Sequence, residues 1–352
     1  MKHLFKFSIY SFALALLVTS CSDDDDFTPS EPLGDYENGY FILHEGGGLI
    51  TPVTYVDEDG TVEQNVFENV NPTADPIGAF KQDLFFDDTR AFIVSGGGQT
   101  VTVLNRYTFE FIATVTTDLI NPRYGAVYNN KAYVTNSGDF GTSTDDFVTI
   151  IDLTDYSTTT IVIGKIAERI EAANGKLYIA NGSFGSGNSV TVLDPSNLGS
   201  MTTIDLGMGN SPNSLEADDG FLYVLSGNST SNGKVFKINL SDDAIDSSID
   251  LPATLTSPRH LDIDGNTIYF TNSTSVYSFA TGSTAVSDVP VMTYVSTSQF
   301  GSMYGFSARN NVLYIADAGD FASAGTAYEY DTSGNLLNTI TTDVAPNSFH
   351  FN

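Results

Sequence analysis

Arginine, amide and aromatic side chains recur at matching places in this 352-residue chain, and these residues are the best suited to contact a ligand. Asn213, Arg259 and Asn347 each directly follow a proline. Guanidinium, amide and aromatic groups around a concave centre suit a flat ligand with polar edges. Alternatively, they cap strand ends or pair with loop aspartates such as Asp139 and Asp320. The candidate ligand-binding residues of this type are Arg123, Tyr124, Arg169, Asn213, Arg259, His260, Tyr304 and Asn347.

Three phenylalanines add an apolar component to this set of candidates. Phe140, Phe184 and Phe321 each lie in a stretch that is otherwise rich in glycine, serine and other polar residues. A large apolar ring in such a loop gains free energy from burial, either under a neighbouring loop or against a ligand. We therefore include all three phenylalanines among the candidate ligand-binding residues and leave both alternatives open.

Other site chemistries lack their sequence patterns. His44, His260 and His350 form no HxH or HExxH spacing, so no zinc site and no bound cofactor are predicted. The segments 57–60 and 262–266 resemble pieces of calcium loops, but neither has the glutamate that completes such a loop, and turns are the better interpretation. The glycine runs at 46–48 and 96–98 precede no Lys-Ser/Thr pair. No catalytic triad or G-x-S-x-G turn is visible.

A sevenfold repeat provides the elements that must position these residues. The central aromatic of each copy is followed by a second strand with alternating apolar residues, such as 148–152 and 235–239. A period of about 45 residues with about four strands per unit is typical of a β-propeller. The central aromatics are Phe41, Phe92, Tyr133, Tyr178, Tyr223, Tyr269 and Tyr314.

The end of the chain predicts that the ring is closed. Several units open with a proline before their first strand, and the last seven residues, 346–352, repeat that opening after the seventh copy. The first unit, at 36–43, has no such opening. We therefore predict an all-β, seven-bladed β-propeller in which the C-terminal strand completes the first blade and covers its edge. The unit openings and the loops between second and third strands then lie on one face.

The segments 132–136 (AYVTN) and 148–152 (VTIID) resemble the repeat of YVTN-type, YncE-like propellers. The resemblance covers residues 38–352 and implies the propeller fold. Because one fold hosts many functions, it does not by itself imply an activity.

The N-terminal residues predict export and a lipid anchor. Residues 1–20 have a charged start and a short apolar core, as expected of a signal peptide. Residues 18–21 resemble a bacterial lipobox, so Cys21, the only cysteine, is the predicted lipidation site. The acidic run at 23–26 resembles the export signal of Bacteroidetes surface lipoproteins. We predict a lipoprotein signal peptide at 1–20, a flexible acidic tether at 21–36 and the propeller at 37–352.

Three functions are consistent with these features. The lipid cysteine, acidic tether and propeller resemble the cobalamin-capturing, BtuG-like lipoproteins of Bacteroidetes. That resemblance implies a non-enzymatic protein on the outer-membrane surface that binds a corrinoid, or another metallophore, and passes it to a TonB-dependent transporter. The alternatives are a glycan-binding or adhesion propeller and a propeller lactonase or lyase. A net charge of −29 argues against nucleic acid as a partner.

Overall fold

The computed structural model describes residues 32–352, except 47, 49–51, 229–230 and 297–302. The predicted signal peptide, Cys21 and the acidic run lie outside the described residues. Leu33–Asn352 forms one compact unit. Within the described residues, no helix has the length and apolar character needed to cross a membrane.

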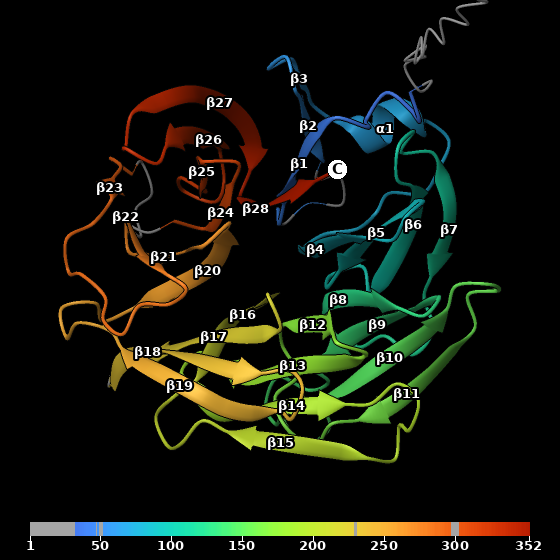
Figure 1. Cartoon of the computed structure of the whole chain (residues 1–352). Helices are drawn as coiled ribbons and strands as arrows, with labels where there is room; N and C mark the ends of the chain where they lie inside the picture. The colour runs from blue at the N-terminus through green and yellow to red at the C-terminus, as the bar shows by residue number, and fades with distance from the viewer. Residues whose placement is uncertain (1–31, 47, 49–51, 229–230, 297–302) are drawn as a thin grey trace, which may run out of the picture. The chain divides into compact units, whose positions relative to one another are not determined.

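The described residues of this unit form seven four-stranded antiparallel sheets, which are arranged as the blades of a propeller (Figure 1). The predicted fold class is confirmed. From the innermost strand outward, blade 1 contains β28 (Pro346–Phe351), β1 (Gly39–His44), β2 (Thr54–Asp57) and β3 (Val62–Glu63). Blade 2 contains β4 (Lys81–Phe86), β5 (Arg90–Ser95), β6 (Thr100–Asn105) and β7 (Phe111–Val115). A short helix, α1 (Val66–Val70), lies between β3 and β4.

The other five blades follow in chain order. Blade 3 contains β8 (Pro122–Tyr128), β9 (Lys131–Asn136), β10 (Phe147–Asp152) and β11 (Thr158–Val162). Blade 4 contains β12 (Ile170–Ala173), β13 (Lys176–Ser183), β14 (Ser186–Leu193) and β15 (Met201–Asp205). Blade 5 contains β16 (Pro212–Asp218), β17 (Phe221–Asn228), β18 (Ser231–Asn239) and β19 (Ala244–Asp250). Blade 6 contains β20 (Pro258–Asp264), β21 (Thr267–Asn272), β22 (Ser275–Ala280) and β23 (Met292–Thr293). Blade 7 contains β24 (Gly305–Arg309), β25 (Val312–Asp317), β26 (Ala324–Asp331) and β27 (Leu336–Val344).

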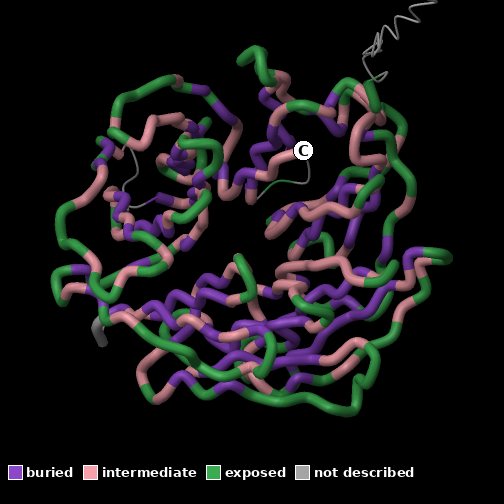
Figure 2. Tube along the Cα trace, viewed as in Figure 1, coloured by how far each residue is buried: buried purple, intermediate pink, exposed green. Residues whose placement is uncertain are grey.

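The middle strands of each blade carry the core. Every central aromatic lies in the second strand of its blade, as Tyr133 does in β9, and these strands are buried along most of their length (Figure 2). They are apolar on both faces because neighbouring blades cover both faces. The outermost strands, such as β15 and β19, are largely exposed.

The hydrophobic core is divided into clusters that lie between neighbouring blades. Tyr133 of blade 3, for example, packs with Ile179 of blade 4, and Tyr223 of blade 5 packs with Phe270 of blade 6. Seven such clusters are found among the described residues, and the last one joins blade 7 to blade 1. Each blade is therefore stabilised by its two neighbours, and the ring has no end blade with an uncovered face.

The C-terminal strand closes the ring, as the sequence predicts. β28 is the innermost strand of blade 1, where His350 pairs with Phe41. The Asn352 side chain donates from Nδ2 to the carbonyl oxygen of Tyr36, and its Oδ1 accepts a hydrogen bond from Arg106 Nε. Tyr36 itself is only 6% exposed. The globular part of the chain therefore begins before residue 37, where the sequence places the end of the flexible tether.

The two segments that resemble calcium loops have structural roles. Residues 57–60 form the β2–β3 turn, in which the Gly60 N–H donates to the carbonyl oxygen of Asp57 at 2.9 Å. Asp262 lies within β20, and its Oδ2 accepts a hydrogen bond from the Ala308 N–H of blade 7 at 2.9 Å. The turn interpretation is confirmed for residues 57–60 and for residues 265–266, which form the β20–β21 turn, while Asp262 lies in β20 and connects two blades.

Candidate functional site

The innermost strands place most of the predicted site residues in two adjacent rings around the channel. To compare the blades, we count positions along each innermost strand from the residue that pairs with the central aromatic, for example Glu171, which pairs with Tyr178. The residues three positions earlier, which we call the mouth ring, are Gln82, Arg123, Glu168, Asn213, Arg259, Tyr304 and Asn347. The next residues, which we call the second ring, are Asp83, Tyr124, Arg169, Ser214, His260, Gly305 and Ser348. Eight predicted residues belong to these two rings.

The mouth ring lies at the end of the propeller where the second strand of each blade leads into the third. In blade 5, Pro212 next to Asn213 pairs with Ser226, close to the end of β17. We call the face that carries the mouth ring and these loops the mouth face, and the opposite face the turn face. Phe140, Phe184 and Phe321 lie in loops of the mouth face, in blades 3, 4 and 7.

Arg123 is the centre of a chain of polar contacts along the mouth ring. Its Nε lies 3.1 Å from Glu168 Oε2, and its Nη1 donates to Gln82 Oε1. Gln82 in turn donates to Glu45 at 3.3 Å. The Ser183 hydroxyl donates to the other carboxylate oxygen of Glu168 at 3.0 Å. These contacts hold the Arg123 guanidinium in one orientation at the mouth.

Asn213 and Asn347 fix the edge of the next inner strand. Asn213 Nδ2 donates to the carbonyl oxygen of Pro258 at 2.9 Å, and Asn347 Nδ2 donates to that of Lys81 at 2.8 Å. Each asparagine thus satisfies a backbone group at the free edge of the neighbouring inner strand, which has no strand partner on the channel side. These contacts are the capping role that the sequence left open for the two residues. Asn213 Oδ1 is buried and has no hydrogen-bond partner among the described residues.

Arg169, Tyr124 and His260 lie in the second ring. The Arg169 guanidinium carbon is 4.6 Å from the centre of the Tyr124 ring. His260 has a φ of +52° in a bulge of β20, a left-handed conformation that is uncommon for residues other than glycine. Burial, together with the charges of Arg169 and Arg259, lowers the pKa of His260 to about 3, so its ring is neutral at physiological pH. A hydrogen bond to the backbone of Met303 leaves His260 Nε2 buried and without a partner among the described residues.

The three phenylalanines differ in how they are buried. Phe321 packs edge-on against Tyr304, with ring centres 4.7 Å apart, so its ring is covered by its own blade. Phe140 is 72% exposed and Phe184 is 98% exposed. Phe184 and Gly185 form the tip of the β13–β14 hairpin, and Phe184 has a φ of +47°. Two rings on adjacent blades therefore stand uncovered at the mouth face.

Buried carboxyl groups lie deeper in the channel. Burial, and then the neighbouring Asp83, raises the pKa of Glu171 to about 7. Burial raises the pKa of Asp83 to about 6. This effect outweighs the hydrogen bond that the Gly125 N–H donates to Asp83 Oδ2 at 2.9 Å, which lowers the pKa. Burial also raises the pKa values of Glu216 and Asp262, which share a hydrogen bond. The sequence predicted neither Asp83 nor Asp262 as a channel residue. A regular offset could have found Asp262, because most central aromatics pair with the inner-strand residue seven positions earlier, as Tyr269 pairs with Asp262.

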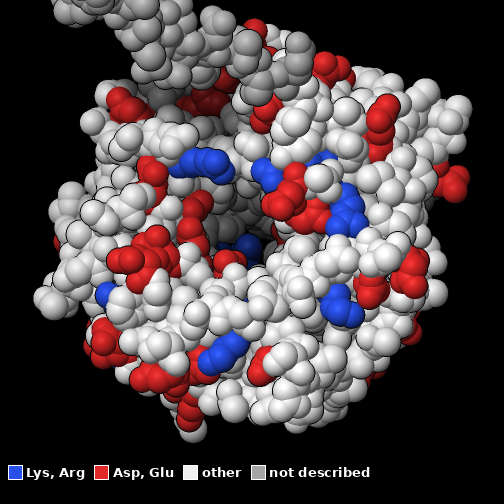
Figure 3. Space-filling view, turned by 45° about the vertical axis from the view of Figure 1, so that its right-hand side comes forward, with Lys and Arg blue, Asp and Glu red and all other residues white. Residues whose placement is uncertain are grey.

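The described residues contain no cluster of three or more His, Cys, Asp or Glu side chains that could hold a metal ion. In a space-filling view, a central hollow has a basic side chain in its depth and acidic side chains around it (Figure 3).

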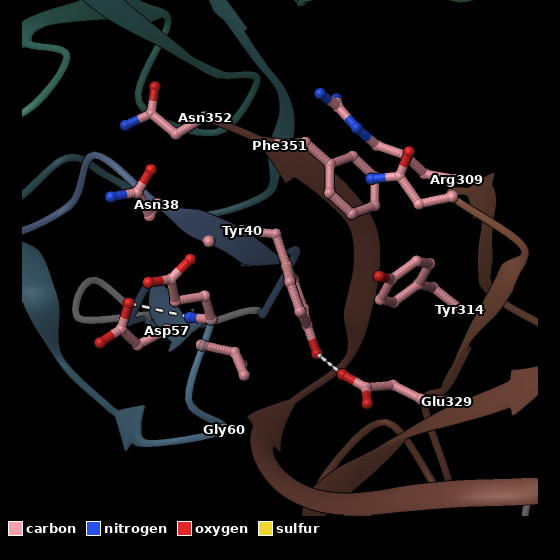
Figure 4. A pocket seen from close by; sticks show the side chains of 13 residues that line it. Asn38, Tyr40, Asp57, Gly60, Arg309, Tyr314, Glu329, Phe351 and Asn352 are labelled. Carbon is pink, nitrogen blue, oxygen red and sulfur yellow. Dashed lines mark hydrogen bonds between the residues drawn. The ribbon is translucent and has the colours of Figure 1, made fainter. Parts of the chain in front are cut away.

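A cleft of about 360 Å³ on the turn face was not anticipated from the sequence. It lies where blades 1 and 7 meet the closing strand, and it is lined mainly by polar side chains around Tyr40 and Phe351 (Figure 4). Tyr40 donates to Glu329 Oε1 at 2.5 Å, and the Arg309 guanidinium lies 4.8 Å from the centre of the Phe351 ring. The amide side chains in the lining are Asn38, Asn310 and Asn352.

Together, the fold and the channel define a seven-bladed propeller with polar rings at the mouth of its channel. The family model of a domain of unknown function, DUF5074, matches residues 38–343. The chain belongs to this family. No curated protein matches the chain.

Solved propeller structures resemble the chain in fold. A quinonprotein alcohol dehydrogenase-like protein from Bacteroides thetaiotaomicron is 15% identical, with a TM-score of 0.69 over 90% of this chain and 78% of the other. A functionally unknown protein from Desulfotomaculum acetoxidans is 14% identical, with a TM-score of 0.63 over 89% and 98%. BamB from Moraxella catarrhalis is 13% identical, with a TM-score of 0.53 over 90% and 86%. At these identities the likeness shows the fold alone.

Proposed function

We propose that the protein captures a small ligand on the mouth face without transforming it chemically. A corrinoid such as cobalamin is the best candidate, and another metallophore is the next. The observation that carries the proposal is the pair of exposed phenylalanines, Phe140 and Phe184, on adjacent blades beside the polar mouth ring.

The chemistry of the mouth face fits a flat ligand with an apolar surface and polar edges. Phe184 exposes nearly its whole ring at the tip of a hairpin, in a backbone conformation that costs free energy for a bulky residue. An uncovered aromatic ring held at such a cost supports a role in contact with a partner molecule. The amide and guanidinium groups of the mouth ring can donate hydrogen bonds to the edges of the same ligand.

The proposal places the protein at the cell surface. The lipid on Cys21 anchors it in the outer membrane, and the acidic tether directs it to the outer leaflet and gives the propeller reach. A TonB-dependent outer-membrane transporter then receives the ligand from the mouth face. The sequence features at residues 18–26 support this part of the proposal.

Isothermal titration with cyanocobalamin tests the proposal. The protein begins at Ser22 and retains the whole compact unit. Phe184→Ala and Tyr304→Ala change the mouth face, and Leu336→Ala is the matched control because Leu336 is a 54% exposed apolar residue at the start of β27, on the turn face. One-to-one binding that is weakened by the two mouth-face variants, but not by the control, supports capture. Absence of binding at micromolar protein concentrations rules out cobalamin as the ligand.

Glycan binding is a second candidate function, and the cleft on the turn face favours it. Its amide side chains and Arg309 present planar hydrogen-bonding groups next to aromatic rings, which suits the hydroxyl groups of a sugar. Titration with neutral oligosaccharides distinguishes the two functions. Sugar binding that Asn310→Ala weakens and Phe184→Ala leaves unchanged assigns it to the cleft.

A further inference from the structure

Five basic side chains in the described part of this acidic protein form ion pairs with carboxylates. The chain has 14 lysines and arginines against 43 acidic residues. Ion pairs within 4 Å join Arg90 to Asp87, Arg123 to Glu168, Lys131 to Asp152, Lys176 to Asp243 and Lys234 to Asp250. Arg169 and Arg259 are among the basic residues that form no ion pair with any described carboxylate. Both belong to the rings at the channel mouth.

Arg169 occupies an environment that is costly for an unpaired cation. It is partly buried in the second ring, where its main contact is the face of the Tyr124 ring. The carboxylate of Asp83 influences Arg169 through space, but it is engaged with the Gly125 N–H and lies outside ion-pair distance of the guanidinium. A partly desolvated guanidinium gains free energy when an anion completes its hydrogen bonds. Its five N–H donors can hold a planar or tetrahedral anion through two parallel bonds.

Arg259 and His260 bring further polar groups to the same place. Arg259 is exposed in the mouth ring, and it directly precedes His260 in the bulge of β20. The inner-strand register puts His260 at the same level of the channel as Arg169, and burial, together with the charges of Arg169 and Arg259, lowers the pKa of its ring. The buried Nε2 of His260 has no partner among the described residues, and it independently marks a position where a polar group of a ligand or a water molecule can bind.

We propose that Arg169 and Arg259 form an anion-binding site at the channel mouth that holds a phosphate or carboxylate group of the captured ligand. The inference rests on the proposed capture of a ligand at the mouth face, and it adds the chemical group by which the ligand is anchored. His260 stays neutral in this site, and its Nε2 accepts a hydrogen bond from a hydroxyl group or water molecule beside the anion.

Titration with sodium phosphate and sodium acetate, against sodium chloride at the same ionic strength, tests the site. The protein begins at Ser22, and the variants are Arg169→Gln and Arg259→Gln. The matched control is Lys237→Gln, because Lys237 also forms no ion pair with the described residues but lies in β18, the third strand of blade 5, away from the two rings. Binding is read by calorimetry and by the rise in unfolding temperature that a ligand of the native state produces. Circular dichroism shows whether each variant is folded.

The expected result is an anion effect that the control keeps and both mouth variants lose. Removing one charged hydrogen-bonding partner should weaken the affinity about 10- to 100-fold. A preference for phosphate assigns a phosphate group, and a preference for acetate assigns a carboxylate. Equal anion effects in all four proteins, or no effect of either anion, overturns the proposal. If Arg169→Gln does not fold, the anion titration of Arg259→Gln still tests the proposal, because Arg259 is exposed.

Cyanocobalamin, titrated in parallel, separates this inference from the proposed function. Anion binding with the expected variant pattern supports the anion site even if cyanocobalamin does not bind. Cyanocobalamin binding without any anion effect overturns the anion site and leaves the capture function intact.

Discussion

Replacing Phe184 by asparagine should stabilise the fold while weakening ligand capture. Phe184 is the first of two residues at the tip of the β13–β14 hairpin, with Ser183 paired to Ser186 on either side. Its φ of +47° and that of Gly185, +81°, are those of a tight turn that prefers Asn-Gly. The side chain is 98% exposed, so its removal sacrifices almost no packing.

The expected gain follows from the backbone. A residue other than glycine in the left-handed region costs on the order of 1–3 kcal/mol, and asparagine adopts this region more readily than phenylalanine does. Phe184→Asn should therefore raise the free energy of unfolding by about 1 kcal/mol. For a unit of this size, that gain corresponds to roughly 1.5 °C in the unfolding temperature, from an unfolding entropy of about 2.1 cal/mol/K per residue.

Equilibrium unfolding in urea measures the gain, and two matched variants isolate its cause. Phe140→Asn also removes an exposed ring from the mouth face, but Phe140 has no positive φ, so its stability should not rise. Phe321→Asn relieves a φ of +60° but loses the contact with Tyr304, and the two effects should nearly cancel.

The reasoning is refuted if Phe184→Asn has the same stability as the unaltered protein or a lower one. It is also refuted if Phe140→Asn shows the same gain, because the effect would then come from removing an exposed apolar ring and not from the backbone. A more stable protein that binds ligand more weakly would identify Phe184 as a residue kept for function at a cost in stability.

Three further predictions concern ring closure and buried charge. Asn352→Ala removes the hydrogen bonds to Tyr36 and Arg106 and should cost about 2 kcal/mol in urea unfolding; an unchanged midpoint would contradict a closing role. Burial lowers the pKa of Lys81 to about 7, so the unfolded state binds more protons above that pH. Stability should therefore rise from about pH 7 to pH 9 relative to Lys81→Met, and parallel pH profiles of the two proteins would contradict the prediction. Burial raises the pKa of Glu171 to about 7, above its unfolded value. The native state should therefore lose up to about 3 kcal/mol as the pH rises from 4.5 to 7.5, and Glu171→Gln should remove this loss; an unaltered profile in the variant would contradict it.

The repeat in the sequence was sufficient to predict the fold. From Tyr133 onward the central aromatics have a nearly constant spacing, and each of the seven, from Phe41 to Tyr314, lies in the second strand of a blade. The recurrence of the unit opening at Pro346 predicted the pairing of β28 with β1. Both predictions depend on local patterns that are repeated along the chain, and such patterns are visible in one sequence.

The contacts in the site could not be predicted in the same way, because they join residues about 45 positions apart that show no local pattern. Asn213 follows a proline as Arg259 does, yet its side chain is engaged by the carbonyl oxygen of Pro258 in the next blade, whereas Arg259 stays exposed. The sequence also predicts a loop around Phe184, but β13 extends to Ser183 and β14 begins at Ser186. The extension places Phe184 at the tip of a hairpin.

The cleft on the turn face has no sequence signature for a related reason. Its walls come from the beginning and the end of the chain, such as Asn38 and Asn352, and from the β24–β25 turn at Asn310. These segments meet because the closing strand brings blade 1 against blade 7. Polar residues at turns are common in propellers, so only the closure of the ring reveals which of them share a concavity.

The order of charges along the channel bears on how a ligand would be held. Arg123, Arg169 and Arg259 lie in the two rings at the mouth, whereas Glu171 and Glu216 lie deeper, opposite the central aromatics. Arg123 is paired with Glu168. The guanidinium groups of Arg169 and Arg259 are therefore the ones that attract an anionic group to the mouth, and the deeper carboxyl groups repel it wherever they are ionised. Burial disfavours negative charge in the depth of the channel, and it raises the pKa values of Glu171 and Glu216 for this reason. A ligand bound through an anion would thus stay at the surface of the mouth face, where a second protein can take it up without opening the ring.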